Sequence, residues 1–289
     1  MKVALPDLPF AYLRGIASAL KTLEEECELQ LFMWNDTTPL MDVFDEIKPD
    51  LVLLYQNQVD ISIDLAAQDC NFEYIVFSAS PIQLQKQPIA YITDSQHVSN
   101  FINYQKNTLL VKPSANVAQI HNGKKSNILE SEVSVFNNDI QLGLEHLNIL
   151  NWLTSKYSTK IFGPQKIELP QYLGDFTIFE RADAIASSKV SVDLGNFDCL
   201  DAAYLKTAPV VFQGAHSLYK NFNSIAQLEE ILKNILNNPT ETTEYCNTVY
   251  QNIINNQTFY HRVSEIFNII NDNHRSTECL NKLKELVSC

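Results

Sequence analysis

Basic residues are scarce and scattered in this sequence. Its 289 residues contain 21 Lys and Arg against 34 Asp and Glu, which gives a formal net charge of −13. The longest basic run is the pair Lys124-Lys125. A chain with this balance repels nucleic-acid backbones and anionic membrane surfaces unless a basic face is segregated. A nucleic-acid partner is therefore disfavoured.

Paired cysteines and long apolar runs are missing too. None of the 6 Cys belongs to a CxxC pair or stands beside a His at zinc-ligand spacing, so we interpret them as free thiols in a reducing compartment. The start MKVALPDLPF has prolines in place of an apolar signal core. Nowhere do about eighteen apolar residues follow one another, as a membrane helix requires. These absences predict a cytoplasmic protein without a membrane span.

Several catalytic signatures are also absent. The sequence contains no GxSxG, no P-loop and no HExxH, and no GxGxxG follows its first expected strand. Hydrolase, NTPase, zinc-protease and dinucleotide-dependent dehydrogenase functions therefore lack their motifs. No D-x-D triplet occurs either, so nothing in the sequence calls for a divalent metal, and we expect no cofactor.

What the sequence does have is a repeated alternation of strands and helices. Hydrophobic residues make up 45% of the chain, which is enough for two cores. Short apolar runs alternate with segments of helical period, a pattern typical of parallel α/β sheets. Strands are expected at 1–6, 28–34, 50–55, 74–78, 89–93 and 107–112, with helices near 11–25, 39–47, 61–69 and 95–104. This predicts a first Rossmann-like domain over residues 1–112.

A polar stretch over residues 113–130 has no sustained period, and we interpret it as a connector. The alternation then resumes and predicts a second Rossmann-like domain over residues 131–273, with an amphipathic helix over 274–289. Its strands are expected at 131–136, 159–163, 190–194 and 208–212, with helices near 140–156, 176–186, 198–206, 224–236 and 240–270. The fold class is thus α/β, with two parallel sheets facing a cleft and ligand loops at their carboxyl ends.

The stretch VDLGNFDCLDAAY places Asp193 and Asp201 with seven residues between them and a third acid, Asp198, nearby. A carboxylate can accept hydrogen bonds from both hydroxyls of a diol, and a Gly-containing loop at a helix start offers backbone N–H groups to a diphosphate. Acids near a helix start are also what capping and the helix dipole favour in any protein. Two interpretations stay open: a ligand site, and a strand end followed by a capped helix.

The context of this stretch resembles a known enzyme family. Residues 172–211, YLGDFTIFERADAIASSKVSVDLGNFDCLDAAYLKTAPVV, resemble the donor-binding half of glycosyltransferases of the GT-B fold, in particular the retaining group-1 family. The segment ILNNPTETTEYCNTVYQNIINNQTFYHRVSEIFNII resembles the closing helices of CgeB-like members. The resemblance implies transfer of a sugar from a nucleotide sugar, for instance a UDP-sugar, to an acceptor. That acceptor could be a glycan, a protein or a small molecule, with DNA disfavoured by the net charge.

The resemblance also implies roles for particular residues. Asp193 would lie against the transferred sugar, and Asp201 would accept the ribose hydroxyls of the nucleotide. In the first domain, Asp7 and His97 follow expected strands and are candidates for the general base of an inverting reaction. The other implied donor-binding residues are Gly195, Asn196, Phe197, Asp198, Asn137, Asn138, Gly163, Phe176, Thr177 and Glu180.

Three departures from the family pattern keep alternatives open. Both acids are Asp where the family has Glu, neither phosphate-facing loop contains Arg or Lys, and Lys206 stands where the family has a Gly-containing turn. One alternative is a catalytically inactive binding or assembly module of the same fold. The other is a viral or phage enzyme that glycosylates modified DNA bases.

Overall fold

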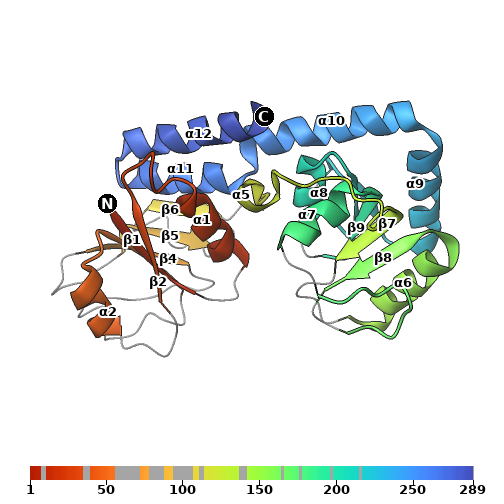
Figure 1. Ribbon diagram of the computed structural model, residues 1–289, viewed down its shortest axis with the longest axis horizontal. Helices are drawn as coiled ribbons and strands as arrows, with labels where there is room; N and C mark the ends of the chain where they lie inside the picture. Colours follow the sequence, from red (N-terminus) through yellow and green to blue (C-terminus); the bar gives the residue numbers. More distant parts are fainter. Residues whose placement is uncertain are drawn as a thin grey trace. The chain divides into compact units, whose positions relative to one another are not determined.

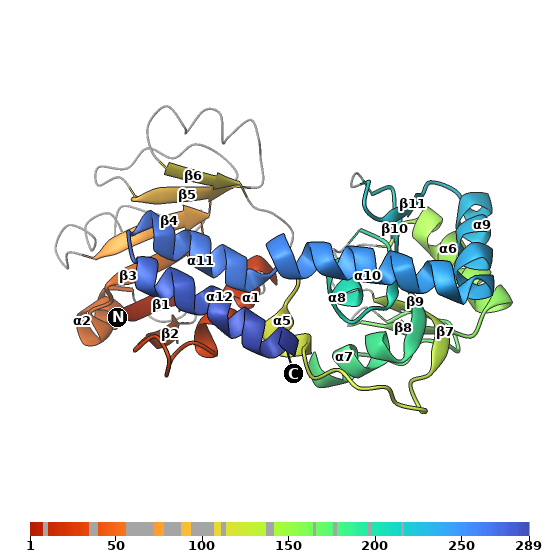
Figure 2. The same cartoon turned by 90° about the horizontal axis from the view of Figure 1, so that it is seen from above.

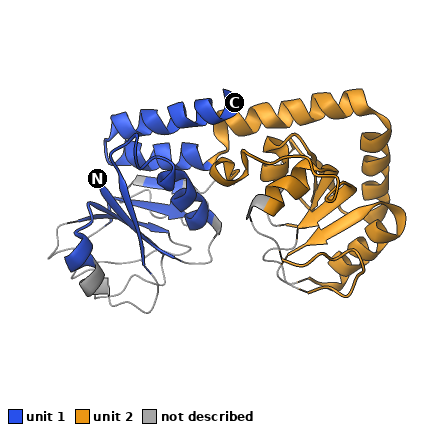
Figure 3. Cartoon of the chain, in the orientation of Figure 1, with its two compact units in different colours: residues 1–112, 259–289 blue, residues 113–258 orange. Residues whose placement is uncertain are grey.

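The computed structural model describes residues 1–7, 11–34, 40–55, 72–77, 88–93, 107–110, 114–136, 142–163, 166–175, 178–195, 198–214 and 217–288. The chain divides into two compact units, shown in different colours in Figure 3. Unit 1 is Met1–Lys112 together with Phe259–Cys289, and unit 2 is Pro113–Thr258. Unit 1 is therefore built from two separate pieces of the sequence.

Unit 1 contains a six-stranded sheet in the order β2-β1-β3-β4-β5-β6. Every neighbouring pair of strands is parallel. Four of the strands, over residues 2–6, 51–55, 73–77 and 90–93, are nearly continuous in apolar residues and largely buried, as central strands of a parallel sheet covered on both faces are. The strands are β1 Lys2–Pro6, β2 Gln30–Trp34, β3 Leu51–Tyr55, β4 Glu73–Phe77, β5 Ala90–Thr93 and β6 Asn107–Leu110.

The last two helices of the chain complete unit 1. Its described helices are α1 Ala11–Lys21, α2 Leu40–Ile47, α11 Phe259–Ile269 and α12 Asn273–Ser288. Figures 1 and 2 show α11 beside α1 over the sheet, with α12 against α11. The core under these helices joins strands to both chain pieces through Val3, Leu51, Ile16, Val263 and Phe267, all buried. The C-terminal piece therefore covers apolar surface that residues 1–112 would otherwise expose.

The boundary of unit 1 differs from the one we expected. Residues 259–273 were expected in the second domain, within one helix over 240–270. The structure has two separate helices in this range. Helix α10 (Pro239–Asn256) ends before Gln257 and Thr258, and α11 begins at Phe259. Thr258 is buried and forms a bridge with Ala115. Helical period cannot reveal this break, since the apolar residues of both helices follow the same spacing.

Close packing of α1 on α11 depends on a glycine. A Cβ built on Gly15 would lie 2.1 Å from the Cε2 atom of Phe259. The Phe259 ring also meets Tyr12 edge to face, with centroids 5.4 Å apart. A glycine in a helix interior ordinarily costs stability. Here it allows the first residue of α11 to rest directly on the α1 backbone.

We expect Gly15→Ala to lower the free energy of unfolding by about 1–3 kcal/mol, because the added methyl overpacks the α1–α11 contact. The usual gain of about 1 kcal/mol for Gly→Ala in a helix is reversed in sign. Urea unfolding checks this, with Arg14→Ala at the neighbouring exposed position as the control. In the double variant with Phe259→Ala, the cost of the added methyl should largely disappear. A Gly15→Ala protein more stable than the wild type would contradict the packing.

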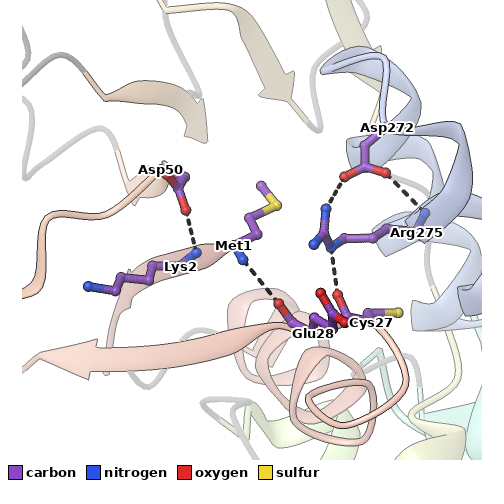
Figure 4. Close-up of polar contacts among 7 residues, drawn as sticks. All are labelled: Met1, Lys2, Cys27, Glu28, Asp50, Asp272 and Arg275. Atoms are coloured by element: carbon purple, nitrogen blue, oxygen red, sulfur yellow. Dashed lines mark hydrogen bonds and ion pairs between the residues drawn. The ribbon is translucent and has the colours of Figure 1, made fainter.

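The amino edge of unit 1 is tied together by main-chain and carboxylate contacts (Figure 4). The N–H of Lys2 donates to Asp50 Oδ2 at 2.6 Å, and the Met1 ammonium donates to the Glu28 carbonyl at 3.0 Å. These bonds join the start of β1 to the residues that precede β3 and β2. These two bonds therefore fix the start of β1 relative to the starts of β2 and β3.

Asp272 and Arg275 fix the start of α12 on the same side of the unit (Figure 4). The backbone N–H of Arg275 donates to Asp272 Oδ1 at 3.1 Å, so Asp272 caps the helix. The guanidinium donates from Nη1 to Asp272 Oδ2 at 2.5 Å and from Nε to the Cys27 carbonyl at 2.8 Å. Asp272 and Arg275 therefore cap α12 and also link its start to the turn before β2.

We expect Asp272→Ala to lower the free energy of unfolding by about 2 kcal/mol at neutral pH, since it removes a cap and an ion pair. Asp272→Asn keeps a capping oxygen and should cost about 1 kcal/mol. Burial alone would raise the pKa of Asp272, but hydrogen bonds from Arg275 outweigh it and hold that pKa below its ordinary value. A lowered folded pKa stabilises above the unfolded value of about 3.9, and the contribution is lost as pH falls through the folded value.

Urea unfolding of wild type and Asp272→Asn at successively lower pH measures this contribution. The difference in stability between the two proteins should shrink as the pH falls below 4. A difference that stays constant over that range would mean that the charge of Asp272 contributes nothing.

Unit 2 contains a five-stranded parallel sheet in the order β11-β10-β9-β7-β8. Its strands are β7 Ser131–Phe136, β8 Thr159–Phe162, β9 Ser188–Asp193, β10 Ala208–Phe212 and β11 Lys220–Phe222. Its helices are α5 Val117–Ile120, α6 Leu144–Lys156, α7 Ile178–Ala186, α8 Asp198–Tyr204, α9 Ile225–Asn237 and α10 Pro239–Asn256. The expected strands of this half are all present, and β11 is an additional one.

Two apolar layers cover the sheet of unit 2. One includes Val133 and Val190 of the sheet with Leu150 of α6 and Leu232 of α9. The other includes Phe136 and Phe162 of the sheet, which stack with centroids 5.2 Å apart, with Ile185 of α7 and Ala202 of α8. Alternate residues of each strand face the two layers, as the period of two in a strand requires. Helices α7 and α8 therefore lie on the face opposite α6 and α9 (Figure 1).

Some sequence expectations lie beyond the described part of the chain. The helices expected at 61–69 and 95–104 both fall outside the described residues. Residues 113–130, expected as a connector, belong to unit 2 and include the short helix α5. No helix among the described residues is long and apolar enough to cross a membrane.

Candidate functional site

The candidate site is the carboxyl edge of the unit 2 sheet, where parallel strands end together. There β7, β8 and β9 end at Phe136, Phe162 and Asp193. Two of these strands are followed by glycines with positive φ, Gly163 at 142° and Gly195 at 118°. Side chains with a Cβ rarely adopt such φ values. The sequence therefore supplies glycine where the chain turns away from the strand ends.

Gly163 is held by the segment that follows it. Its N–H donates to the Gly174 carbonyl at 3.0 Å, and its own carbonyl accepts from the Tyr172 hydroxyl at 2.6 Å. Tyr172 forms a bridge with Ile161 of β8, which extends the sheet by one residue pair. The turn YLG is thus part of this edge of the sheet.

Asp193 ends β9 and is almost completely buried, at 1% relative exposure. Its Oδ1 accepts from the N–H of Gly195 at 2.7 Å, and its Oδ2 accepts from the N–H of Cys199 at 3.1 Å. The carboxylate therefore bridges the loop after β9 and the first turn of α8. Both oxygens take part in shaping the loop, which is the capping role that the sequence left open.

Asp201 lies one turn into α8 and is also buried, at 8% relative exposure. Its Oδ2 accepts from Nη2 of Arg181 on α7 at 3.0 Å. Its Oδ1 accepts from the backbone N–H of Asn116, the residue before α5, at 3.0 Å. The Arg181 guanidinium also lies 5.5 Å from the ring centroid of Phe136, at the end of β7. Asp201 therefore joins α7, α8 and the segment before α5.

A second acid on α7, Asp183, binds the segment that follows α5. Asp183 of α7 accepts from the N–H of Lys124 at 2.7 Å. The hydroxyl of Ser187 accepts from the N–H of Ser126 at 2.8 Å. A Cβ on Gly123 would lie 2.9 Å from the Ala182 carbonyl oxygen, so the backbone approaches α7 closely. The expected connector is thus a docked part of unit 2.

We expect Asp201→Ala to lower the free energy of unfolding by about 3 kcal/mol, since it leaves the mostly buried Arg181 guanidinium without its carboxylate. Asp183→Asn, which perturbs the same segment without removing an ion pair, should cost about 1 kcal/mol. Urea unfolding monitored by circular dichroism measures both. If Asp201→Ala were as stable as the wild type, the ion pair would contribute nothing to the fold.

Other residues singled out by the sequence are placed as follows. Glu180 is exposed in the first turn of α7. Asp7 is exposed after β1 in unit 1, and its N–H donates to the Trp34 carbonyl at 2.7 Å. Asp198 begins α8, but its side chain is outside the described ones. Also outside the described residues are His97, Asn137, Asn138, Phe176, Thr177, Asn196 and Phe197.

Two basic side chains near the site in sequence have structural partners. Arg181 binds Asp201, as above, and the Lys160 ammonium donates to the Ile128 carbonyl. Lys206, which replaces the family's glycine turn, adopts φ 57° and lies 4.5 Å from the ring centroid of Tyr250. The turn is therefore made in the left-handed conformation without glycine.

Asn116 is the residue of this region that sequence reasoning missed. It stands in a polar stretch without period, and its contact with Asp201 spans 85 positions in the sequence. No motif or spacing marks it. A contact of this kind becomes visible only once the fold brings α8 beside α5.

No protein-family model matches the sequence, and no curated protein matches it either. Solved structures, in contrast, match over nearly the whole chain. A glycosyltransferase from Rickettsia africae ESF-5 has a TM-score of 0.62 at 10% identity and covers 99% of this chain and 98% of its own. Anabaena HepE in complex with UDP has a TM-score of 0.58 at 10% identity and covers 98% of this chain and 100% of its own. UDP-GlcNAc 2-epimerase from Neisseria meningitidis bound to UDP-GlcNAc has a TM-score of 0.56 at 10% sequence identity. It covers 94% of this chain and 100% of its own.

The fold is of the GT-B type. Two parallel-sheet α/β domains and a C-terminal helix were expected, and this fold class is confirmed. Proteins of this fold include both glycosyltransferases and epimerases that act on nucleotide sugars. The likeness at this level of identity concerns the fold, so the function has to be argued from the residues of the site.

Proposed function

We propose that this protein is a metal-independent glycosyltransferase that takes its sugar from a nucleotide sugar, with a UDP-sugar the first choice. Structures of the same fold that cover 98% and 94% of this chain are described as bound to UDP and to UDP-GlcNAc. That observation carries the proposal, because it connects a fold shared over nearly the whole chain with one class of ligand. The spacing of Asp193 and Asp201, which resembles that of the two acids in retaining glycosyltransferases of this fold, supports transfer over other nucleotide-sugar chemistry.

The geometry of unit 2 supports placing the donor at the carboxyl edge of its sheet. Asp193 accepts from the N–H of Gly195, and the chain turns at this glycine directly after β9. Phosphate groups bind well to backbone N–H groups presented by such turns. In this proposal Asp193 lies beside the transferred sugar, while Asp7 stays a candidate for handling the acceptor hydroxyl.

We expect the wild type to bind at least one of UDP-, GDP-, ADP- or TDP-sugars with a Kd in the range of about 1 µM to 1 mM. Gly195→Ala should weaken that binding by about tenfold or more, since alanine is strained at φ 118° and the loop has to shift. Isothermal titration measures affinity, and release of free nucleotide in the presence of candidate acceptors measures turnover.

Asp183→Asn is the matched control, because it disturbs α7 without touching the loop after β9. Its affinity should equal that of the wild type. The proposal fails if no nucleotide sugar binds, or if both variants bind as the wild type does.

A second candidate function is a non-catalytic module that keeps the fold for binding or assembly. The observation that favours it is the ion pair between Asp201 and Arg181, which occupies one oxygen of the implied ribose acceptor. Binding of a nucleotide sugar without turnover of any acceptor would select this candidate. Turnover would exclude it.

A further inference from the structure

Unit 1 contains two buried cysteines that come from opposite ends of the sequence. Cys27 lies in the turn before β2 and is 2% exposed, and Cys279 lies on α12 and is 0% exposed. Both are free thiols. A buried thiol packs as a small apolar side chain, so its chemistry depends on the group that it faces.

The contacts on either side of Cys279 place it against the turn that contains Cys27. Arg275 Nε donates to the Cys27 carbonyl at 2.8 Å (Figure 4). The Lys282 ammonium binds the carboxylate of Glu26, the residue before Cys27. Positions 275, 279 and 282 stand at i, i+4 and i+7, so they share one face of α12. Cys279 therefore lies on this face between two residues that contact positions 26 and 27.

The two thiols also influence each other electrostatically. Burial raises the pKa of both, and the neighbouring Cys27 thiol adds to the shift of Cys279. Because thiolates are the nucleophiles of disulfide chemistry, a covered and neutral pair is unreactive while α12 stays docked. The buried side chains of α12 are Ser276, Cys279 and Leu283. So small a buried face favours local opening of this terminal helix, which uncovers the pair.

We propose that Cys27 and Cys279 form a reversible disulfide that fastens α12 to the rest of unit 1 under oxidising conditions. One thiolate of the pair attacks a sulfur of a small disulfide such as glutathione disulfide, which forms a mixed disulfide and releases one glutathione thiolate. The other cysteine thiolate attacks the protein sulfur of that mixed disulfide and releases the second glutathione. The released thiolates take up the two protons that the cysteines lost, so two protein thiols are oxidised as one small disulfide is reduced.

The bond would change the stability of unit 1 more than its shape. It closes a loop that contains most of the chain, which restricts the unfolded state strongly. The sequence predicts a reducing compartment, where disulfides are usually transient. The pair is therefore a redox-sensitive fastening for α12, and this inference goes beyond the proposed function without depending on it.

Mass spectrometry tests whether the bond forms. The folded full-length protein is incubated with glutathione disulfide, its remaining thiols are alkylated, and its peptides are mapped. A peptide pair that joins Cys27 to Cys279 is expected, and dithiothreitol should remove it. The inference is overturned if, after this treatment, both cysteines remain thiols, carry separate glutathione groups or are joined to other cysteines.

Urea unfolding tests what the bond does. Trp34 ends β2 in unit 1 and Trp152 lies on α6 in unit 2, so a Trp152→Phe background leaves Trp34 fluorescence as the reporter of unit 1. Oxidation should raise the urea midpoint of this signal by about 1 M, and dithiothreitol should reverse the shift. A linked protein whose midpoint does not rise would contradict the fastening.

Cysteine-to-serine variants provide the controls. Cys279→Ser should show neither the linked peptides nor the shift in midpoint, and Cys27→Ser makes the same test if that variant folds poorly. Cys246→Ser removes a buried thiol of α10 in unit 2 and should behave as the wild type. An equal shift on oxidation in Cys279→Ser or Cys27→Ser would assign the effect to other cysteines and overturn the inference.

Discussion

The candidate site depends on the bonds of the buried Asp201 carboxylate, above all its ion pair with Arg181. The carboxylate accepts from Arg181 of α7 and from the backbone before α5, while the Asp201 backbone belongs to α8. Three segments of one layer therefore share a single buried group. Removing one partner of a buried ion pair costs more than forming it gains, since the remaining charge is left desolvated. The position of α7 and α8 over the strand ends is thus coupled to the ion pair of this acid with Arg181.

Both acids of the stretch VDLGNFDCLDAAY turn out to have internal partners. Asp193 shapes the loop after β9 and the start of α8, and Asp201 joins helices. Capping and ligand binding are not exclusive, because a carboxylate has about four acceptor positions and Asp201 uses two of them for these bonds. A group held by internal bonds is also preorganised, so that a ligand need not order it. The internal bonds of Asp201 are therefore compatible with either interpretation of the sequence.

The strands of unit 2 and the alternation of unit 1 could be predicted because a period of two and a period of 3.6 leave strong local patterns. Contacts between distant residues leave no such pattern. The bond from Asn116 to Asp201 and the packing of Phe259 on Gly15 depend on how the chain folds back. The end of unit 2 at Thr258 was missed for the same reason, since a bridge to Ala115 decides it. The glycines at 163 and 195 were identifiable, but their bonding partners were not.

The departures from the family pattern differ in how much they bear on function. Lys206 in place of glycine has a local solution, a left-handed turn with the ammonium near Tyr250, so it leaves the fold of α8 and β10 unchanged. The shorter acid at position 201 matters more. A Glu there would carry its carboxylate one methylene beyond the position that now meets Asn116 and Arg181. With Asp, the carboxylate stays within the layer, where it accepts from Arg181 and from the backbone N–H of Asn116. The shorter side chain therefore keeps this acid in its internal bonds, whereas a longer one would carry the carboxylate past them.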